Sequence, residues 1–267
     1  MDLGLGRRVA VVVGAARGLG QAIAAEFARE GAIVALFDVS PDVHTAAEAL
    51  ARTGATAISH IMDVTDFPAV QRVAGEVRAG FGRVDHVVFA AGVGSGKFGF
   101  PFWRLDPADW LRVLNVNLVG AVNVAHAFAP GMAEARSGTF LFLASVAGQI
   151  GSQTDPPYSA SKAGLINFAQ CAAKDLAPFG VRVNSLCPGM VRTPLNQSVW
   201  QAWADRQPPE TRQDYDTWAA EKIAKLVPLN RWQTPEDVAA MAVFLASERA
   251  ANITGQTVNV DGGYVIR

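Results

Sequence analysis

Short runs of β-branched and aromatic residues alternate along the chain with longer Ala-rich segments of helical spacing. The predicted strands are 9–13, 33–37, 57–61, 86–89, 139–143, 181–186 and 257–260. The predicted helices are 19–30, 43–52, 69–81, 107–132, 158–176 and 235–247. Continuous apolar runs suit strands buried on both faces, and their alternation with helices favours a parallel sheet. We therefore expect an α/β fold, a doubly wound parallel sheet of about seven strands with helices on both faces.

A stretch at 194–233 breaks this alternation. It is rich in Trp, interrupted by Pro and only weakly periodic. It follows the sixth predicted strand, at the edge where open α/β sheets bind ligands, so we interpret it as a substrate-loop insertion that shapes a pocket. A long surface decoration is the alternative. No linker, repeat or charge block divides the other residues, and we expect one domain over 1–267.

Composition excludes several classes of protein. Half of the residues are apolar, and 23 basic residues nearly balance 24 acidic ones. A chain with this much apolar surface to bury is not expected to be disordered. Its balanced charge gives no excess of basic residues for binding nucleic acid. The charged fraction is 18%, against about 25% in typical domains. This shortage of charge predicts further burial between subunits.

The longest uncharged stretch, 113–133, is long enough to span a bilayer. Five polar or helix-breaking residues interrupt it: Asn115, Asn117, Asn123, His126 and Pro130. Such residues are costly in hydrocarbon, so we expect a buried helix and no membrane contact. The first residues include arginines without an apolar segment ahead of them, which predicts a cytoplasmic protein. Cys171 and Cys187 lack the spacing of metal ligands, so no metal is expected.

The first predicted strand runs directly into a glycine-rich segment and then into a helix. The glycines are Gly14, Gly18 and Gly20. Glycine at these positions lets the backbone turn tightly and approach a pyrophosphate, whose charge the N-terminus of a helix favours. Glycines also mark ordinary turns, but the strand before them and the helix after them predict a dinucleotide-binding loop.

Asp38 ends the second predicted strand. A carboxylate there accepts hydrogen bonds from the adenosine ribose hydroxyls and repels a 2′-phosphate, which favours NAD over NADP. Arg17 in the glycine loop favours NADP, because a guanidinium pairs with a phosphate. An uncompensated carboxylate costs more than a mobile arginine gains, so we predict NAD. The alternative for Asp38 is a simple turn residue.

Tyr158 and Lys162 lie four residues apart in a predicted helix and therefore share one face. A phenol has a pKa of about 10, and a nearby ammonium favours the phenolate, so we expect the pKa of Tyr158 to be lowered. Ser145 adds a hydroxyl that orients a substrate oxygen. The three residues supply a general base, its charged partner and a hydrogen-bond donor. A Tyr and a Lys at this spacing also occur by chance in many helices.

Together with the glycine loop, this pattern resembles the short-chain dehydrogenase/reductase family over nearly the whole chain. The matching segments, in the family's order, are Gly14 to Gly20, Asp63-Val64, Ala91-Gly92, Ser145, Tyr158-Ser-Ala-Ser-Lys162, Pro188-Gly189 with Thr193, and Asp261-Gly262-Gly263. The resemblance implies a Rossmann-type fold in which Tyr158 is the general acid/base. It also implies that Lys162 holds the nicotinamide ribose and that Ser145 polarises the substrate oxygen.

The family's fourth catalytic residue is an Asn that anchors a proton-relay water. Asn115 and Asn117 both lie in the corresponding predicted helix. Residues two apart on a helix point about 200° apart, so only one of them faces the site. The family pattern of Asn, Leu and then Gly matches 117–120, and we predict Asn117.

The resemblance also assigns contacts with the cofactor. It implies that Asp63 and Val64 contact the adenine, and that Val191 and Thr193 contact the carboxamide side of the nicotinamide. The full predicted set is Gly14, Arg17, Gly18, Leu19, Gly20, Asp38, Asp63, Val64, Ala90, Ala91, Gly92, Tyr158, Lys162, Pro188, Gly189, Val191 and Thr193. Val13 and Ala90 depart from the Thr and Asn that are usual in the family. Both family residues brace the backbone, so these departures concern local rigidity more than chemistry.

These assignments predict an oxidoreductase that transfers a hydride between NAD(H) and a secondary alcohol or ketone. Aromatic residues crowd the site region, namely Phe102, Trp103, Trp200, Trp203, Tyr215 and Trp218. Aromatic faces suit sugar C–H groups or flat apolar rings, and Arg192, Arg206 and Arg212 suit a carboxylate. We expect a sugar, polyol or sugar acid. The alternatives are aromatic residues that pack on one another and arginines that are solvated.

Three rival functions remain open from the sequence. An NADPH-dependent 3-ketoacyl reductase would explain Arg17. A non-catalytic regulator would bind NAD without turnover, and a structural subunit would use the fold only for assembly. The intact Ser145, Tyr158 and Lys162 favour the enzyme. The family is commonly dimeric or tetrameric, and the uncharged helix at 113–133 is expected at a contact within a homodimer or homotetramer.

Overall fold

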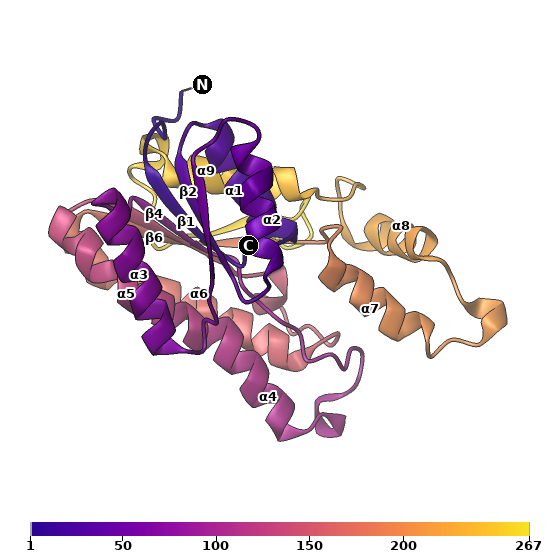
Figure 1. The fold of residues 1–267 in the computed structure, drawn as a ribbon. Helices are drawn as coiled ribbons and strands as arrows, with labels where there is room; N and C mark the ends of the chain where they lie inside the picture. Colours follow the sequence, from indigo (N-terminus) through magenta and orange to yellow (C-terminus); the bar gives the residue numbers. More distant parts are fainter. Residues whose placement is uncertain (1, 267) are drawn as a thin grey trace.

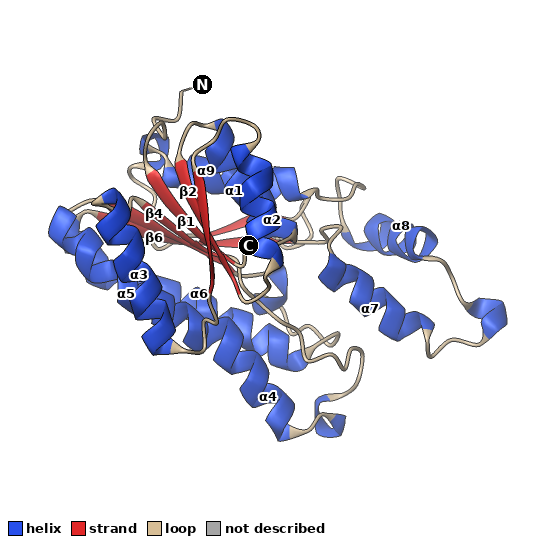
Figure 2. Cartoon of the chain, viewed as in Figure 1, coloured by secondary structure: helices blue, strands red, loops and turns tan. Residues whose placement is uncertain are grey.

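The computed structural model describes residues 2–266, which contain one parallel sheet. The strands lie in the order β3-β2-β1-β4-β5-β6-β7. Figure 2 draws them in red, with helices on either side. The strands are β1 (Val9–Val13), β2 (Ile33–Asp38), β3 (Ala57–Ile61), β4 (His86–Phe89), β5 (Gly138–Leu143), β6 (Val181–Pro188) and β7 (Thr257–Val260). Every neighbouring pair is parallel. The predicted parallel sheet of about seven strands is confirmed.

Helices cover both faces of the sheet (Figure 1). One layer holds α1 (Gly18–Arg29), α2 (Asp42–Ala51) and α9 (Pro235–Ala246), and the other holds α3 (Phe67–Phe81), α5 (Gly120–Ala135) and α6 (Pro156–Leu176). The strand β1 serves both layers: Ala10 and Val12 join the first core, whereas Val9, Val11 and Val13 join the second. Successive strand residues point to opposite faces, so a continuously apolar strand needs a helix layer on each side.

Among the described residues, one helix, Pro107–Ala135, is long and apolar enough to cross a membrane by length and composition. It consists of α4 (Pro107–Leu114), one π-helical turn (Asn115–Val119) and α5. Its inner face packs on the sheet through Val124, Phe128 and Met132, whereas Val119 and Val122 are exposed. The expectation of a buried helix therefore holds for one face only.

The stretch at 194–233 forms two helices, α7 (Pro194–Ala204) and α8 (Tyr215–Leu226), which project from the body of the sheet (Figure 1). Thr193 and Asp214 start them by accepting hydrogen bonds from backbone N–H groups of the first turns. The weak periodicity did not predict these helices, because their apolar residues face each other rather than the sheet. Tyr215 contacts Trp200 and Trp218, with ring centroids 5.7 Å and 6.2 Å away.

Candidate active site

The sequence-predicted residues gather at the edge where the parallel strands have their carboxyl ends. Strands β2 and β3 lie on one side of β1, and β4 to β7 lie on the other. Open α/β sheets bind ligands where the strand order reverses in this way. Gly14, Asp38, Gly92, Ser145 and Gly189 end or closely follow β1, β2, β4, β5 and β6 respectively.

Close packing explains the glycines that follow β1. A Cβ on Gly14 would lie 2.5 Å from the backbone nitrogen of Ala91, and one on Gly20 would clash with the Gly14 carbonyl oxygen. Gly18 has a left-handed backbone with φ of 62°, and no atom lies within 4 Å of the place where its Cβ would be. The first turn of α1 therefore approaches the end of β1 closely and is open beside Gly18.

The N-terminus of α1 is suited to a pyrophosphate. Arg17 precedes the helix and makes no side-chain capping hydrogen bond, and the first turn contains no acidic residue. Its first backbone N–H groups are thus free to donate to an anion, which the helix dipole also favours. The loop with Gly14, Gly18, Leu19 and Gly20 fits the dinucleotide expected from the sequence.

Asp38 lies beside this loop, where backbone groups hold its carboxylate. Oδ2 accepts a hydrogen bond from the Ala16 N–H at 3.0 Å, and Oδ1 accepts one from the Ser40 N–H at 2.9 Å. Arg17, the neighbour of Ala16, is exposed. The two residues with opposite preferences for a 2′-phosphate thus lie in one region.

Asp63 and Val64 follow β3 and differ in exposure. Asp63 is exposed, and its Oδ1 accepts hydrogen bonds from the N–H and hydroxyl of Thr65, both at 2.8 Å. Val64 is buried against Gly120, where it leaves no room for a Cβ. Asn123 donates to the Val64 carbonyl at 2.9 Å. Of the two side chains, only that of Asp63 is accessible at this edge.

The segment after β4 closes on the end of β1. The Ala90 N–H donates to the Val13 carbonyl at 2.8 Å, so the two positions that depart from the family pattern pair through their backbones. Ala91 follows against the glycine loop. A Cβ on Gly92 would lie 3.4 Å from Nζ of Lys162, which joins this segment to the Tyr158 helix.

The segment after β6 leads into α7. Pro188 ends the strand, and Gly189 has no room for a Cβ. Val191 is buried and forms an isolated parallel bridge with Gln233. Thr193 then caps α7. The two ends of the 194–233 stretch are therefore bridged at its base.

Ser145, Tyr158 and Lys162 come together in the structure. Tyr158 and Lys162 lie one turn apart on α6, with Nζ of Lys162 5.5 Å from the centroid of the phenol ring. The same Nζ donates to the Leu143 carbonyl at 2.6 Å. A Cβ on Gly148 would lie 2.7 Å from the Lys162 carbonyl carbon, so the turn that carries Ser145 packs directly on α6.

Burial controls the ionisation of this pair. It raises the pKa of Tyr158 to about 12, and the side chain of Ser145 opposes the rise. It lowers the pKa of Lys162 to about 8. The expected lowering of the Tyr158 pKa is therefore wrong for this arrangement, because desolvation of the phenolate outweighs any attraction to an ammonium that burial itself disfavours.

Asn117 connects Tyr158 to the segment after β4. It is fully buried in the π-helical turn, whereas Asn115 is exposed, as their spacing requires. Its Oδ1 accepts from the Val93 N–H at 2.8 Å, and its Nδ2 donates to the Val93 carbonyl and to Oγ of Ser161, both at 2.9 Å. Ser161 donates to the Tyr158 carbonyl at 2.7 Å.

Sequence reasoning missed Ser161 and Asp155 at this site. Asp155 is the residue before α6, and its carboxylate accepts a hydrogen bond from the Ser95 N–H at 2.8 Å. An Asp directly before Pro156 and Pro157 is a helix-start signal that was available in the sequence.

The arginines expected to bind a carboxylate have other partners. Arg192 pairs with Asp216 and lies over the ring of Tyr215, 5.6 Å from its centroid. Arg206 donates to the Phe98 carbonyl at 2.7 Å and lies over the ring of Phe100, 4.8 Å from its centroid. Arg212 is exposed. The aromatic residues of α7 and α8 pack on one another, as the alternative interpretation expected.

Comparison with known proteins gives the same family. A family profile described as enoyl-(acyl carrier protein) reductase matches residues 14–265. A 3-oxoacyl-[acyl-carrier-protein] reductase of Thermotoga maritima is 33% identical over 260 residues, covering 97% of this chain and 98% of the relative. A D-threitol dehydrogenase of Mycolicibacterium smegmatis is 36% identical, covering 100% and 96%.

A solved structure agrees in fold. It is described as a putative NAD(P)-dependent gluconate 5-dehydrogenase from Beutenbergia cavernae with bound NADP at low occupancy. It superposes with a TM-score of 0.87 at 34% identity, covering 99% of each chain. The chain therefore belongs to the short-chain dehydrogenase/reductase family, oxidoreductases that act on alcohols and ketones with a nicotinamide cofactor.

Proposed function

We propose that the protein oxidises a secondary alcohol, or reduces the corresponding ketone, with NAD(H) as its cofactor. The observation that carries the proposal is the meeting of Ser145, Tyr158 and Lys162 at the strand edge that also holds the glycine loop. Asn117 completes the catalytic set, because it links the Tyr158 turn to the segment after β4.

The chemistry divides among these residues. A bound nicotinamide would supply the hydride acceptor for alcohol oxidation. The Ser145 hydroxyl donates a hydrogen bond to the substrate oxygen, and Tyr158, as the phenolate, takes the hydroxyl proton. Lys162 would hold the nicotinamide ribose, and in its charged form it favours the Tyr158 phenolate. Lys162 and Asn117, which lie behind Tyr158, would then relay the proton away from the phenol.

The cofactor is proposed to be NAD rather than NADP. Asp38 stands at the end of β2 with a carboxylate fixed by two backbone N–H groups. Such a group accepts hydrogen bonds from ribose hydroxyls, whereas a 2′-phosphate would bring a second negative charge against it. Gly14, Gly18 and Gly20 would surround the pyrophosphate, and Val191 and Thr193 would lie on the carboxamide side.

The substrate is proposed to be a sugar, polyol or sugar acid. One relative is named as a D-threitol dehydrogenase and one structure as a putative gluconate 5-dehydrogenase, which are a polyol and a sugar-acid activity. Because Arg192 and Arg206 already bond within the protein, a neutral polyol fits this chain better than an acid.

A cofactor-reduction screen tests this proposal. Wild-type protein is mixed with NAD and a panel of polyols, aldonic acids, hydroxyacyl thioesters and hydroxysteroids, and formation of NADH is followed by absorbance. Turnover is expected with polyols or sugar acids. Activity confined to steroids or apolar ketones would reject the substrate class. Binding of NADH without turnover of any alcohol would favour the regulator instead.

The second candidate is an NADPH-dependent 3-ketoacyl reductase. The exposed Arg17 beside the glycine loop favours it, as does the Thermotoga maritima relative. The ratio of kcat/KM with NAD to kcat/KM with NADP separates the two, and a strong preference for NADP would overturn the proposed role of Asp38.

We also propose that 1–267 act as one domain, within which 194–233 form the substrate loop. The sheet and its two helix layers provide the cofactor side, and α7 with α8 provide the substrate side. The assembly is proposed to be a homodimer or homotetramer, which the exposed apolar residues of the helix Pro107–Ala135 support.

A further inference from the structure

Asp155 precedes α6 and has no part in the chemistry proposed above. The residue is only 5% exposed. Oδ2 accepts a hydrogen bond from the Ser95 N–H at 2.8 Å, whereas Oδ1 is buried without a hydrogen-bond partner. A buried carboxylate with one unpaired oxygen is costly for folding, so its presence beside Tyr158 calls for a functional explanation.

The group that Asp155 holds is the loop 93–99, between β4 and α4. A Cβ on Gly94 would lie 2.8 Å from Oδ2 of Asp155, so the loop backbone approaches the carboxylate too closely for any side chain at this position. The Gly99 N–H donates to the Thr154 carbonyl at 2.7 Å. Residues 154–155 thus hold both ends of this short loop.

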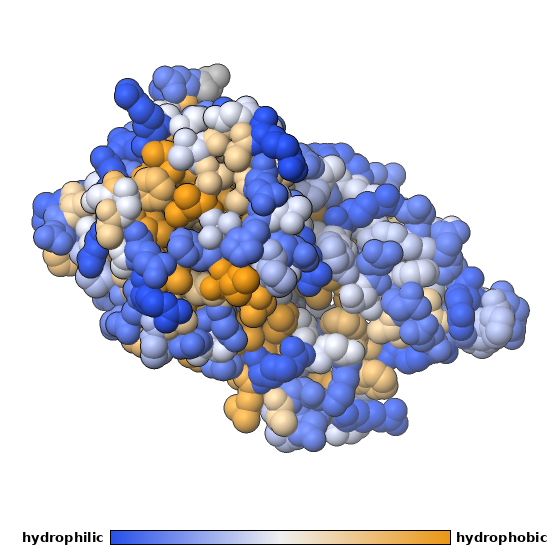
Figure 3. Space-filling model, viewed as in Figure 1, coloured by the Kyte–Doolittle hydropathy of each residue, from blue (hydrophilic) through white to orange (hydrophobic). Residues whose placement is uncertain are grey.

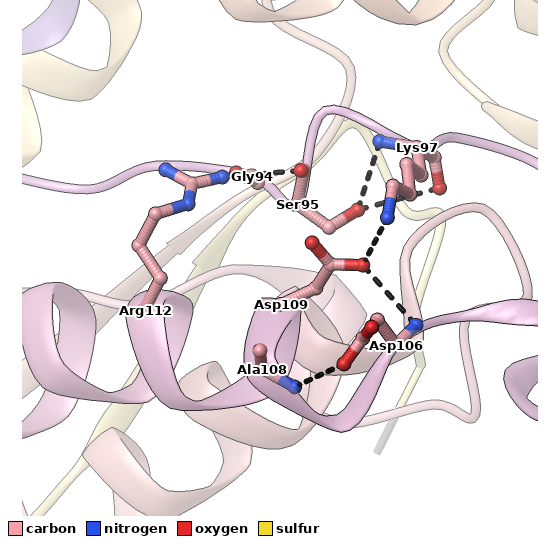
Figure 4. A network of polar contacts seen from close by, with 7 residues as sticks. All are labelled: Gly94, Ser95, Lys97, Asp106, Ala108, Asp109 and Arg112. Carbon is pink, nitrogen blue, oxygen red and sulfur yellow. Dashed lines mark hydrogen bonds and ion pairs between the residues drawn. The ribbon is translucent and has the colours of Figure 1, made fainter.

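Helix α4 holds the same loop from another side (Figure 4). Arg112 donates to the carbonyls of Gly94 and Ser95 at 2.8 Å and 3.1 Å, and Lys97 donates to Asp109 at 2.6 Å. In the close-up, Asp109 and Arg112 extend from one helix toward the loop. When Asp155 is changed, the loop therefore stays anchored to α4 and, through Gly99, to the Thr154 carbonyl, but it loses the hydrogen bond at Ser95.

Two prolines separate Asp155 from Tyr158 at the start of α6. Pro156 and Pro157 occupy the first positions of α6 and have no N–H, so Tyr158 is the first residue of the helix with a backbone donor. The N-terminus of α6 faces Asp155, whose negative charge is favoured there by the helix dipole.

We propose that Asp155 is a positioning residue that fixes the loop 93–99 against the first turn of α6, and so sets where a substrate lies relative to the Tyr158 hydroxyl. Asn117 holds Val93 at the start of the loop, so the loop is fixed at both ends. The inference rests on the proposed function, in which Tyr158 is the general base.

The charge of Asp155 also acts on the phenol. The titratable groups that face Tyr158 are Cys187 from β6, Lys162 from α6 itself, and Asp155. Asp155 and Cys187 both raise the pKa of Tyr158 beyond the effect of burial, whereas Ser145 lowers it. A neutral residue in place of Asp155 therefore favours the phenolate at lower pH.

The carboxylate of Asp155 has its own set of facing groups. Burial raises its pKa, while the Ser95 backbone and side chain, the Tyr158 backbone and the charge of Arg112 oppose that rise. Arg112 belongs to α4, so the loop, α4 and α6 all contribute to the environment of this one carboxylate.

Two substitutions separate position from charge. Asp155→Asn keeps an oxygen that accepts from Ser95 but removes the charge, whereas Asp155→Ala removes both. Asp155→Asn is expected to lower the pKa of Tyr158, with little change in the KM for the alcohol. Asp155→Ala should show the same shift and a KM for the alcohol raised about tenfold, a change of about 1.4 kcal/mol, with NADH affinity unchanged.

Asp109→Asn is the matched control, because it removes a carboxylate that holds the same loop from α4. It should leave the titration of Tyr158 unaltered. If Asp155→Ala fails to fold, Asp155→Glu displaces the carboxylate while keeping its charge, and it should raise KM without the shift in the pKa of Tyr158. An unchanged KM in the folded variant, Ala or Glu, would overturn the positioning role.

A second readout does not depend on turnover. The chain has three tyrosines, so the difference in tyrosinate absorbance between wild type and Tyr158→Phe isolates the titration of Tyr158. That titration should begin at lower pH in Asp155→Asn, and identical titrations would overturn the charge effect. If wild type oxidises no alcohol, the proposed function is contradicted. The titration would still test whether the charge of Asp155 acts on Tyr158.

Discussion

Asp38 and Arg17 act in opposite directions on the choice of cofactor, and Asp38 has the better-fixed position. Its two oxygens are held by backbone N–H groups of Ala16 and Ser40, whereas Arg17 is exposed. Asp38→Asn should therefore lower the ratio of NAD to NADP efficiency at least about tenfold, which corresponds to about 1.4 kcal/mol. Initial-rate kinetics with both cofactors measure it. Asp42→Asn, at the start of α2, should leave the ratio unchanged.

Tyr158 and Lys162 predict how the rate depends on pH. Burial lowers the pKa of Lys162 to about 8 and raises that of Tyr158 to about 12. Tyr158 and Lys162 lie close enough to titrate as a pair. The pair loses its first proton near pH 8, the lower of the two pKa values, and it can accept a proton from the substrate only after that loss. The kcat/KM for alcohol oxidation should therefore rise with pH through about 8, while that for ketone reduction falls. Flat profiles over this range would contradict the assignment.

At the scale of elements, the turn from β1 into α1 depends on a glycine without space for any side chain. Gly20→Ala places a Cβ against the Gly14 carbonyl, so this variant should melt at lower temperature and lose affinity for NADH. Gly75→Ala is the control, because Gly75 lies within α3 with open space around it. It should stabilise the protein by about 0.5–1 kcal/mol. Thermal unfolding and NADH titration measure both effects.

Helices α7 and α8 have a small aromatic core of their own. Trp218 is only 3% exposed, and its ring centroid lies 6.2 Å from those of Trp203 and Tyr215. Removing a buried Trp costs about 3–5 kcal/mol, and here the loss falls on the helix pair rather than the sheet. Trp218→Ala should raise the KM for the alcohol while NADH affinity stays the same. Lys225→Ala, exposed on α8, should change neither constant.

The sequence predicted the elements that face the sheet better than those that do not. Strands such as β1 and β4 were predicted with the bounds observed, because burial on both faces makes them almost continuously apolar. The helices α7 and α8 were missed, since their aromatic residues pack on each other. Asn117 was chosen correctly as the buried Asn of its pair. The raised pKa of Tyr158 and the role of Asp155 depend on burial and on contacts distant in sequence, which spacing does not report.

At the scale of the whole molecule, apolar side chains remain exposed on and near α4. Phe102, Trp103 and Leu111 are 62%, 71% and 70% exposed, and Figure 3 shows apolar surface extending down toward α4. Leu111→Glu should therefore shift a homodimer or homotetramer toward smaller species in light scattering at micromolar concentration. Ile61→Glu, on the exposed edge strand β3, should not. A wild-type monomer under these conditions would contradict the proposed assembly.

The proposed mechanism requires that one phenol oxygen exchanges the substrate proton while the cofactor binds independently of it. Tyr158→Phe removes only that oxygen, so wild type and variant can be compared directly in alcohol-dependent reduction of NAD and in NADH binding. The mechanism predicts that the variant loses nearly all turnover, by roughly a hundredfold or more, and binds NADH with wild-type affinity. Turnover at the wild-type rate in Tyr158→Phe would contradict it.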